Sequence, residues 1–449
     1  MITDSLWPIL MLVVLLVGIF SGYSVAFVLA GTGVLFAFVA DLPTVFLSMG
    51  VSRIYSGTLT NWLLIAIPLF VYMGLMLERS GVAERLLTSL ARLLGPMPGG
   101  YAFSVIVIGI VMAASTGIIG ASVVLLGLLA LPMMKEAGYS RQTSSGLVAA
   151  TGTLGILIPP SIMLIILGDT LRISVGHLFI GAVFPGLILG GLYIAYIAAL
   201  ALFRPGMMPP LPKSDKLGFA KTIILLLQDL VAPLVLVVAV LGSIVVGIAT
   251  PTEAAGIGAI GATILALAAM RGRLHEFGEV LRATTKTTVM IIFVMLGATI
   301  FSLVFKRLGG ESLILGAFLG LDVEPFTVII MIMLLIFILG LFLEWVEITL
   351  IVLPLFAPII IALDFGIPQE EAMLWFALLF ALNLQTSFLT PPFGYALFYL
   401  RGIAPDGYTI GDIYRGVLPF VLLQLTALLL LLFFPGLATW LPQTLMGAG

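Results

Sequence analysis

The sequence predicts an all-α membrane protein that crosses the bilayer many times. Hydrophobic residues occupy 61% of its 449 positions and charged residues only 9%, and the mean hydropathy is +1.28. Long apolar runs recur along the chain, and about 20 apolar residues suffice for one helix to cross the hydrocarbon layer. The runs are continuous rather than alternating, which favours helices over a β-barrel. This composition does not fit a soluble fold.

The composition also excludes several kinds of functional site. No cysteine is present, which excludes disulfides, thiolate metal sites and a cysteine nucleophile. The two histidines, His177 and His275, fall in predicted loops, which argues against a buried histidine metal site. The net charge of -2 and the lack of a basic run give no indication of nucleic-acid binding. The first twenty residues lack the features of a signal peptide and are expected to belong to the first helix.

Apolar runs, delimited by charges and Gly/Pro clusters, define the candidate spans. Two of the runs exceed one crossing yet carry small or polar residues at their centres, "ASTGIIGAS" at 114–122 and "LEWVEIT" at 343–349. Each is predicted to be a re-entrant hairpin, because its first arm is too short to cross and non-helical backbone at this depth must face protein or water. The runs lie near 6–20, 24–40, 61–78, 101–134, 142–168, 177–203, 222–249, 251–270, 287–305, 326–363, 370–400 and 416–441.

The order of the runs indicates an internal duplication. Over 6–203 and again over 222–441, three spans precede an amphipathic connector, a hairpin, a span broken by a double proline and a final span. Five crossings in each half invert the second half relative to the first, as in many secondary transporters. The predicted fold is therefore two inverted repeats with about ten transmembrane helices and two re-entrant helical hairpins.

The distribution of basic residues is an independent test of this topology. With the N-terminus outside, all but four of the 19 lysines and arginines fall on the inner side, in agreement with the positive-inside rule. The four on the outer side are Arg53, Arg172, Lys306 and Arg307. The turn "SGYS" at 21–24 decides the side of the N-terminus, which would be inside if the first two runs were one helix. The two hairpins open from opposite sides, so their tips are expected to meet near the midplane.

The two proline-broken spans carry a functional pattern. "GTLGILIPPS" at 152–161 follows the first hairpin, and "LQTSFLTPPFG" at 384–394 follows the second. Proline lacks an N–H and disfavours helical geometry in the residue before it, so carbonyl oxygens one turn earlier lose their partners. Such carbonyls and nearby hydroxyls are the hard oxygen ligands that alkali cations need. We expect a sodium site at each break, although an ordinary proline kink would account for either motif alone.

The candidate site residues come from the broken spans and the hairpin tips. The candidate substrate contacts are Ser122 at the first tip and the intramembrane carboxylates Glu344 and Glu347 at the second, which are costly unless paired or wet. Small-residue helix packing is the alternative for Ser122, and the two glutamates would share one face of a helical turn. The predicted sodium ligands are Ser115, Thr116, Gly117, Thr153, Gly155, Pro159, Gln385, Thr386, Ser387, Thr390 and Pro391.

A helix start is predicted in "GIATPTEAAG" at 247–256. Thr250 is the N-cap, Pro251 takes the first helical position and Glu253 closes a capping box. This motif is therefore assigned to structure rather than to a ligand site.

Together these motifs resemble the large membrane subunit of the tripartite ATP-independent periplasmic (TRAP) transporters. The resemblance implies a sodium-driven elevator, in which a transport domain of hairpins and broken helices moves against a fixed scaffold. It also implies a separate small four-helix membrane subunit, a soluble periplasmic binding protein, and an organic anion, often a carboxylate or sugar acid, as substrate. The stretches that carry it, in family order over nearly the whole chain, are "ASTGIIGAS", "LPMMKEAGYS", "GTLGILIPPSIMLIILGD", "TPTEAAG", "GLFLEWVEITLIVLP" and "TPPFGYALFYLRG".

The resemblance further implies a division of the chain and a location. The hairpins and broken helices at 101–176 and 326–402 would form the transport domain, and the segments 1–100 and 177–325 would form scaffold helices, arms and a cytoplasmic loop. Residues 403–449 would hold the C-terminal helix. The protein would reside in a bacterial or archaeal inner membrane, and its local sequence is most similar to the branch labelled for 2-oxo acids, mannitol or haloaromatic compounds.

Two other functions remain open from the sequence. A self-sufficient sodium/dicarboxylate-type carrier would share the fold but need no binding protein. An intramembrane hydrolase would use Glu344 and Glu347, but no histidine pair and no serine–histidine arrangement stands near them. The leading prediction is therefore a permease rather than an enzyme.

Overall fold

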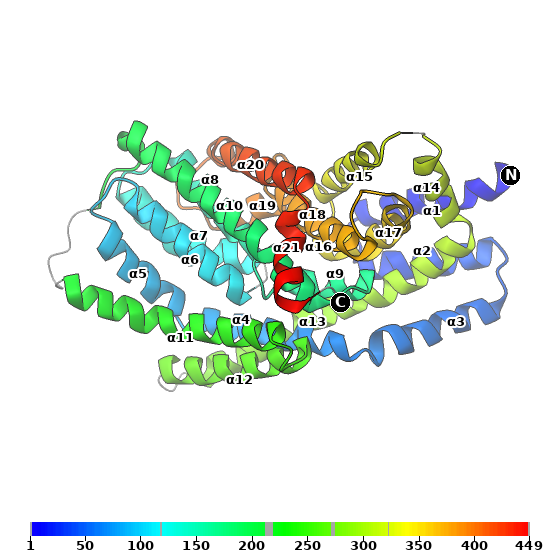
Figure 1. Ribbon diagram of the computed structural model, residues 1–449, viewed down its shortest axis with the longest axis horizontal. Helices are drawn as coiled ribbons and strands as arrows, with labels where there is room; N and C mark the ends of the chain where they lie inside the picture. The colour runs from blue at the N-terminus through cyan, green and yellow to red at the C-terminus, as the bar shows by residue number, and fades with distance from the viewer. Residues whose placement is uncertain (1, 117–118, 212–218, 271–273, 322, 448–449) are drawn as a thin grey trace.

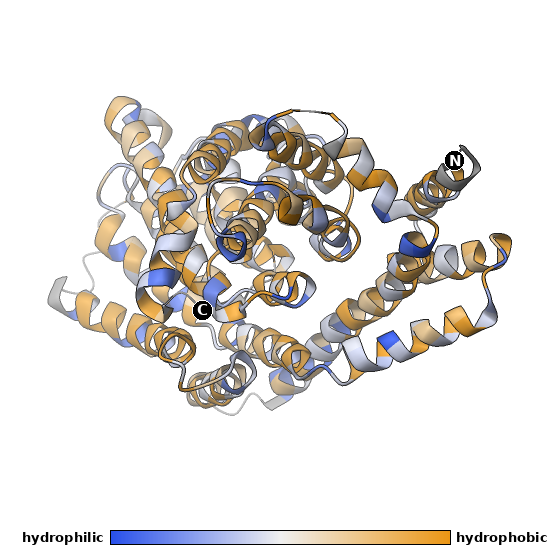
Figure 2. Ribbon diagram, turned by 45° about the vertical axis from the view of Figure 1, so that its right-hand side comes forward, coloured by the Kyte–Doolittle hydropathy of each residue, from blue (hydrophilic) through white to orange (hydrophobic). Residues whose placement is uncertain are grey.

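The computed structural model describes residues 2–116, 119–211, 219–270, 274–321 and 323–447, and all regular elements in these residues are helices. Eight helices there are long and apolar enough to cross a membrane, or nine if a bent pair counts as one span. Hydrophobic residues dominate the helices along their length (Figure 2). The predicted all-α polytopic class is confirmed.

The first half of the chain forms helices α1 to α10. A π-helix, η1 (Tyr55–Leu59), and a 3-10 helix, η2 (Trp62–Ile65), join α3 to α4, and a second 3-10 helix, η3 (Thr153–Ile156), follows α8. The α-helices are α1 (Ile2–Phe20), α2 (Val25–Val39), α3 (Thr44–Ile54), α4 (Ala66–Arg79), α5 (Val82–Leu94), α6 (Gly100–Thr116), α7 (Ile119–Glu136), α8 (Arg141–Gly152), α9 (Ile162–Leu171) and α10 (Val175–Phe203).

The second half forms α11 to α21, after a short 3-10 helix, η4 (Pro205–Met207). The predicted last run, 416–441, is two helices, because Pro435 cannot continue the hydrogen-bond ladder of α20. The helices are α11 (Phe219–Val245), α12 (Pro251–Met270), α13 (Leu274–Arg307), α14 (Gly310–Leu319), α15 (Pro325–Gly340), α16 (Trp345–Ile351), α17 (Leu353–Ala362), α18 (Gln369–Leu389), α19 (Tyr395–Ile403), α20 (Ile410–Phe433) and α21 (Gly436–Met446).

The turn at 21–24 separates α1 from α2. Gly22 has a φ of +83°, a left-handed conformation that glycine adopts without a steric cost. The two helices then pack against each other. The first two runs are thus two helices, as the predicted topology requires.

The third span of the first half is longer than its apolar run predicts. Helices α3, η1, η2 and α4 follow one another from Thr44 to Arg79, whereas the run begins only at residue 61. Ser48, Gly50 and Arg53 interrupt the hydrophobic pattern of α3, so hydropathy alone does not detect this helix. The second half has a counterpart of similar length in the single helix α13.

The packing of the scaffold helices reflects the inverted duplication. Helix α2 packs along α13 of the second half, and its counterpart α12 packs along α4 of the first half. Figure 1 shows α12 beside α4 and α11, and α13 beside α3. This exchange of equivalent partners between the halves is the arrangement expected of inverted repeats.

Both predicted hairpins are present. Helices α6 and α7 pack together as the two arms of the first, which end at Thr116 and begin again at Ile119. In the second, α15 is followed by a turn at 341–344 and by the pair α16 and α17, which are bent by 50° around Val352. The second tip therefore lies slightly earlier than the predicted stretch 343–349.

The predicted capping box at α12 is confirmed. The backbone N–H of Thr250 donates to Glu253 Oε2 at 2.8 Å, and the N–H of Glu253 donates to Thr250 Oγ1 at 3.3 Å. Pro251 is the first residue of α12. This motif starts a helix, as its spacing predicts.

Candidate functional site between the hairpin tips

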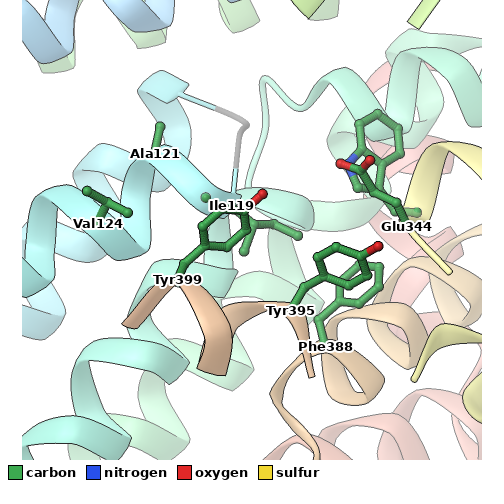
Figure 3. Close-up of a pocket in the computed structure, with 9 residues that line it drawn as sticks. Ile119, Ala121, Val124, Glu344, Phe388, Tyr395 and Tyr399 are labelled. Carbon is green, nitrogen blue, oxygen red and sulfur yellow. The ribbon is translucent and has the colours of Figure 1, made fainter. Parts of the chain in front are cut away.

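A cavity of about 310 Å³ lies between the two hairpin tips. Tyr395 and Tyr399 project from α19 into the space between the start of α7 and Glu344 (Figure 3). Side chains from both hairpins and from the second broken helix thus share one cavity, as the predicted topology requires. The lining residues are Ile119, Gly120, Ala121, Val124, Glu344, Trp345, Phe388, Tyr395 and Tyr399.

The first tip supplies the start of α7 to this cavity. Gly120 keeps it open, because a Cβ there would lie only 2.9 Å from Cζ of Tyr399. Ser122 is 1% exposed and is not one of the lining residues. Ser115 and Thr116 are the last residues of α6, and Gly117 lies outside the described residues.

The two glutamates of the second tip have different positions. Glu344 is the N-cap of α16 and lines the cavity. Glu347 is 9% exposed, and its Oε2 accepts the backbone N–H of Glu344 at 3.2 Å, which completes a capping box. The two glutamates are three residues apart, which predicts one shared helical face and is also the spacing of a capping box. Glu347 therefore has a structural role in starting α16, and Glu344 is the glutamate that faces the cavity.

The first broken helix unwinds after Gly152. The chain continues as η3 through Thr153 and Gly155 and resumes as α9 at Ile162. Pro159 is buried and forms a cis peptide bond with Pro160. The predicted break is present, and its backbone is enclosed by protein, as irregular backbone at membrane depth requires.

The second broken helix places the predicted polar residues at the end of α18. Thr386 Oγ1 donates to Leu382 O at 2.9 Å, and Ser387 Oγ donates to Leu384 O at 2.8 Å. Thr390, the C-cap of α18, precedes the cis bond between Pro391 and Pro392. Each of these donating hydroxyls uses its proton within the helix and keeps lone pairs that can accept a further donor or a cation.

A buried hydrogen-bond network joins the two broken helices. Gln385 Nε2 of α18 donates to Thr153 Oγ1 of η3 at 3.4 Å, and Gln424 Nε2 of α20 donates to the same oxygen at 3.4 Å. Gln424 Nε2 also donates to Tyr193 Oη of α10 at 2.8 Å. Among the described residues, Oε1 of both glutamines has no hydrogen-bond partner although both residues are 0% exposed. Unpaired buried oxygens of this kind are costly unless an ion or water satisfies them.

Sequence reasoning missed four residues of this region, and sequence signals point to three of them. Gln424 is a polar residue in the middle of the apolar run of α20, where an amide is expected to have a buried partner. Tyr395 and Tyr399 stand four residues apart after the second double proline, which places them on one helical face. Tyr193 gives no such signal, because tyrosine is common in apolar helices.

A family model and several relatives match this chain. The model, described as the DctM component of the tripartite ATP-independent periplasmic transporters, matches residues 12–437. The C4-dicarboxylate TRAP transporter large permease protein DctM of Pseudomonas aeruginosa is 31% identical, over 86% of this chain and 88% of that protein. The sialic acid TRAP transporter large permease protein SiaM of Vibrio cholerae is 29% identical, over 88% of this chain and 89% of that protein.

Two further comparisons concern a longer permease and the fold. The isethionate TRAP transporter permease protein DctMQ of Oleidesulfovibrio alaskensis is 31% identical, and the match covers 86% of this chain but 59% of that longer protein. The crystal structure of the Alcanivorax borkumensis YdaH transporter, described as having an unusual topology, aligns with a TM-score of 0.62 at 16% identity, over 88% of this chain and 89% of that one. At this identity the likeness concerns the fold alone. The chain therefore belongs to the DctM family, the large membrane permeases of the tripartite ATP-independent periplasmic transporters, which are transport proteins and not enzymes.

Proposed function

We propose that this permease couples the inward movement of a small organic anion to sodium entry. The observation that carries the proposal is the pair of broken helices, one in each half, joined through Thr153 and Gln385. Their residues fit a hard cation, because the hydroxyls of Thr386 and Ser387 keep free lone pairs and Gln385 Oε1 lacks a partner among the described residues. Sodium prefers ligand sets of neutral oxygens such as these.

The proposed substrate is an organic carboxylate or a related anion, such as a 2-oxo acid. The relatives named above are permeases for C4-dicarboxylates, sialic acid and isethionate, and all three ligands are organic anions. The cavity between the hairpin tips is proposed as the site, with Tyr395 and Tyr399 as hydroxyl donors to the anion. Glu344 would be neutralised by protonation or by the coupling ion, because a bare carboxylate would repel the substrate.

The proposed assembly contains a small four-helix membrane subunit and a periplasmic binding protein in a bacterial inner membrane. Membership of a tripartite family supports both partners. The longer relative DctMQ supports the small subunit, since the chain matches only part of it. A carrier that works alone would not need these components and is the disfavoured alternative.

The movement proposed is an elevator. The hairpins and broken helices, 101–176 and 326–402, would move as one transport domain against the scaffold segments 1–100 and 177–325. The contact between η3 and α18 would keep the moving part rigid, because it joins buried side chains from the two segments of that domain.

Reconstitution tests the proposal. The permease is placed in proteoliposomes with its small subunit, and uptake of labelled succinate, isethionate and N-acetylneuraminate is followed with the binding protein outside. Uptake of one anion is expected with an inward sodium gradient and not with a potassium gradient of equal size. Uptake that needs neither sodium nor the binding protein would exclude the proposal.

A binding measurement tests the sodium site directly. Sodium is expected to raise the melting temperature of the purified permease, because a ligand that binds only the folded state stabilises it. Thr386→Val should abolish this rise, since it removes an oxygen at the second break. Thr426→Val is the matched control, because Thr426 is exposed on α20 and donates in the same way to Leu422 O at 2.8 Å. An equal rise in both variants would place the sodium elsewhere.

A further inference from the structure

A second cavity, of about 590 Å³, lies apart from the hairpin tips and shares no lining residue with the cavity there. Its walls come from the end of α3, η1, the end of α9, the last turns of α13, and the second-hairpin helices α16 and α17. The volume falls in the range of small-molecule sites. Its polar lining includes Arg53, Ser56, Thr58, Asp169, Arg172 and Lys306.

The charge of this cavity is unusual for the predicted outer side of the protein. Of the four basic residues that the topology leaves outside, Arg53, Arg172 and Lys306 all line it. Lys306 Nζ is paired with Glu311 Oε2 at 3.1 Å, whereas neither arginine forms an ion pair with a described residue. Two guanidinium groups are therefore available to a ligand.

The acidic residue of the cavity has another partner. Asp169 Oδ1 accepts a hydrogen bond from Asn61 Nδ2 at 2.6 Å. Asn61 is the N-cap of η2, and its own Oδ1 accepts the N–H of Leu63 at 3.0 Å. The Asn61 side chain thus holds this carboxylate in place. Asp169 also attracts the nearby charge of Arg172, but neither arginine donates a hydrogen bond to it among the described residues.

The backbone around the arginines departs from regular helix. Ser56 and Thr58 belong to the π-helix η1, a form found mostly as short insertions and often at functional sites. Arg172 ends α9 with a φ of +57°, in the left-handed region that residues other than glycine rarely adopt. Such outliers cluster at ligand sites, where the surrounding structure maintains them.

We propose that this cavity is an anion site, in which Arg53 and Arg172 hold a carboxylate or sulfonate group of the transported anion before it reaches the hairpin tips. Guanidinium groups suit this task, because they bind planar and tetrahedral oxyanions through two parallel hydrogen bonds. The identity of the ligand as the transported anion rests on the proposed function. Because α3 and α13 belong to the proposed scaffold, while α9, α16 and α17 belong to the proposed transport domain, an elevator movement would take the cavity apart and release the anion.

Chemical protection tests the site without transport. The purified full-length permease is treated with phenylglyoxal, which modifies arginines, in the presence of succinate, isethionate or N-acetylneuraminate, and mass spectrometry follows each arginine. One probe is expected to slow modification of Arg53 and Arg172 about tenfold when present at ten times its dissociation constant. Arg307 is the matched control, since it is exposed beside Lys306 and does not line the cavity.

Three results of this experiment would overturn the inference. One is modification of Arg53 and Arg172 at unchanged rates with all three probes. Another is equal protection of Arg307, which would mean a non-specific effect of the anion. The third is protection of the two arginines in a parallel reaction that contains the periplasmic binding protein and no anion, which would make the cavity a protein contact.

Uptake kinetics give the second test. In the reconstituted complex, Arg53→Gln with Arg172→Gln is expected to raise the half-saturating substrate concentration at least about tenfold, because charge-assisted bonds to the anion are lost, while Arg307→Gln leaves it unchanged. If the double variant does not fold, Arg53→Gln alone serves, since Arg53 is exposed at a helix end. If the arginine variant shows sodium-coupled uptake with an unchanged half-saturating concentration, this inference is overturned and the proposed function is not. If the unaltered complex takes up the anion without sodium, the proposed function is excluded, and the protection result is unaffected.

Discussion

The hydroxyl of Thr153 and the amide of Gln385 are in contact across the two halves of the molecule, with Nε2 and Oγ1 3.4 Å apart. Thr153 also accepts a bond from Gln424 and donates its proton to Ala150 O at 2.8 Å. One donor and two acceptor positions exhaust what a hydroxyl offers. A cation at the first break would therefore be held by main-chain oxygens of η3 rather than by this side chain.

The first prediction concerns this contact. Thr153→Val should lower the free energy of unfolding by about 1–3 kcal/mol, because it removes the acceptor of the buried Gln385 amide and one of the two acceptors of the Gln424 amide. Thermal unfolding of the purified protein measures the change. Thr426→Val, which removes an exposed hydroxyl from α20, should have little effect. Equal stability of the two variants would mean that the network contributes nothing.

The second prediction concerns the contact between the first hairpin and the first broken helix. A Cβ on Gly152 would lie 2.9 Å from Cα of Val123 and 3.0 Å from its backbone nitrogen. Because backbone cannot yield as a side chain does, Gly152→Ala should cost about 1–3 kcal/mol. Gly191→Ala, in α10 with no atom within 4 Å of the new Cβ, should be neutral or stabilise by up to about 1 kcal/mol. Thermal unfolding compares them, and a stable Gly152→Ala variant would contradict the packing described.

The third prediction tests the elevator with engineered cysteines, for which the cysteine-free chain is a clean background. Asn61 and Asp169 are in contact across the proposed scaffold and transport domains. Asn61→Cys with Asp169→Cys should therefore lose uptake when bridged by a short bis-methanethiosulfonate cross-linker and recover it when the cross-linker is released by a reductant. Comparing the bridged and reduced states of one variant removes any effect of the substitutions themselves.

A matched pair lies within the proposed scaffold. Tyr72 of α4 and Thr263 of α12 have their hydroxyl oxygens 2.8 Å apart. Tyr72→Cys with Thr263→Cys should be bridged by the same cross-linker without loss of uptake, because the two helices would not move apart. Full uptake by the bridged Asn61/Asp169 pair would be incompatible with an elevator.

The fourth prediction separates the structural and electrostatic roles of Glu347. Glu347→Ala should cost about 1 kcal/mol, because the N–H of Glu344 loses its acceptor at the start of α16. Glu347→Gln keeps an acceptor oxygen and should retain both stability and uptake. Thermal unfolding and sodium-driven uptake measure the two effects.

The capping box of α12 provides the comparison. Glu253→Ala should lower stability by up to about 1 kcal/mol and leave uptake unchanged, because this box is exposed and its residues line neither cavity. Loss of uptake in a stable Glu347→Gln variant would instead assign the charge of Glu347 to transport.

Local chemistry in the sequence accounts for much of this fold. The double prolines at 159–160 and 391–392 predict the two helix breaks, because proline removes a donor wherever it occurs. Thr250 and Glu253 predict the N-terminal cap of α12 in a similarly local way, because both partners lie within one helical turn. The apolar runs predict the spans and hairpins, while α3 escapes detection because its polar residues dilute the hydrophobic signal.

Contacts between distant residues were decided only by the tertiary structure. Nothing in the sequence pairs Thr153 with Gln424, or brings Arg53 and Arg172 to one cavity. The sequence by itself determined where helices start, break and are buried in lipid, because those properties depend on neighbours along the chain. The meeting of the two halves depends on how inverted helices pack, and packing selects among many arrangements that the same local pattern allows.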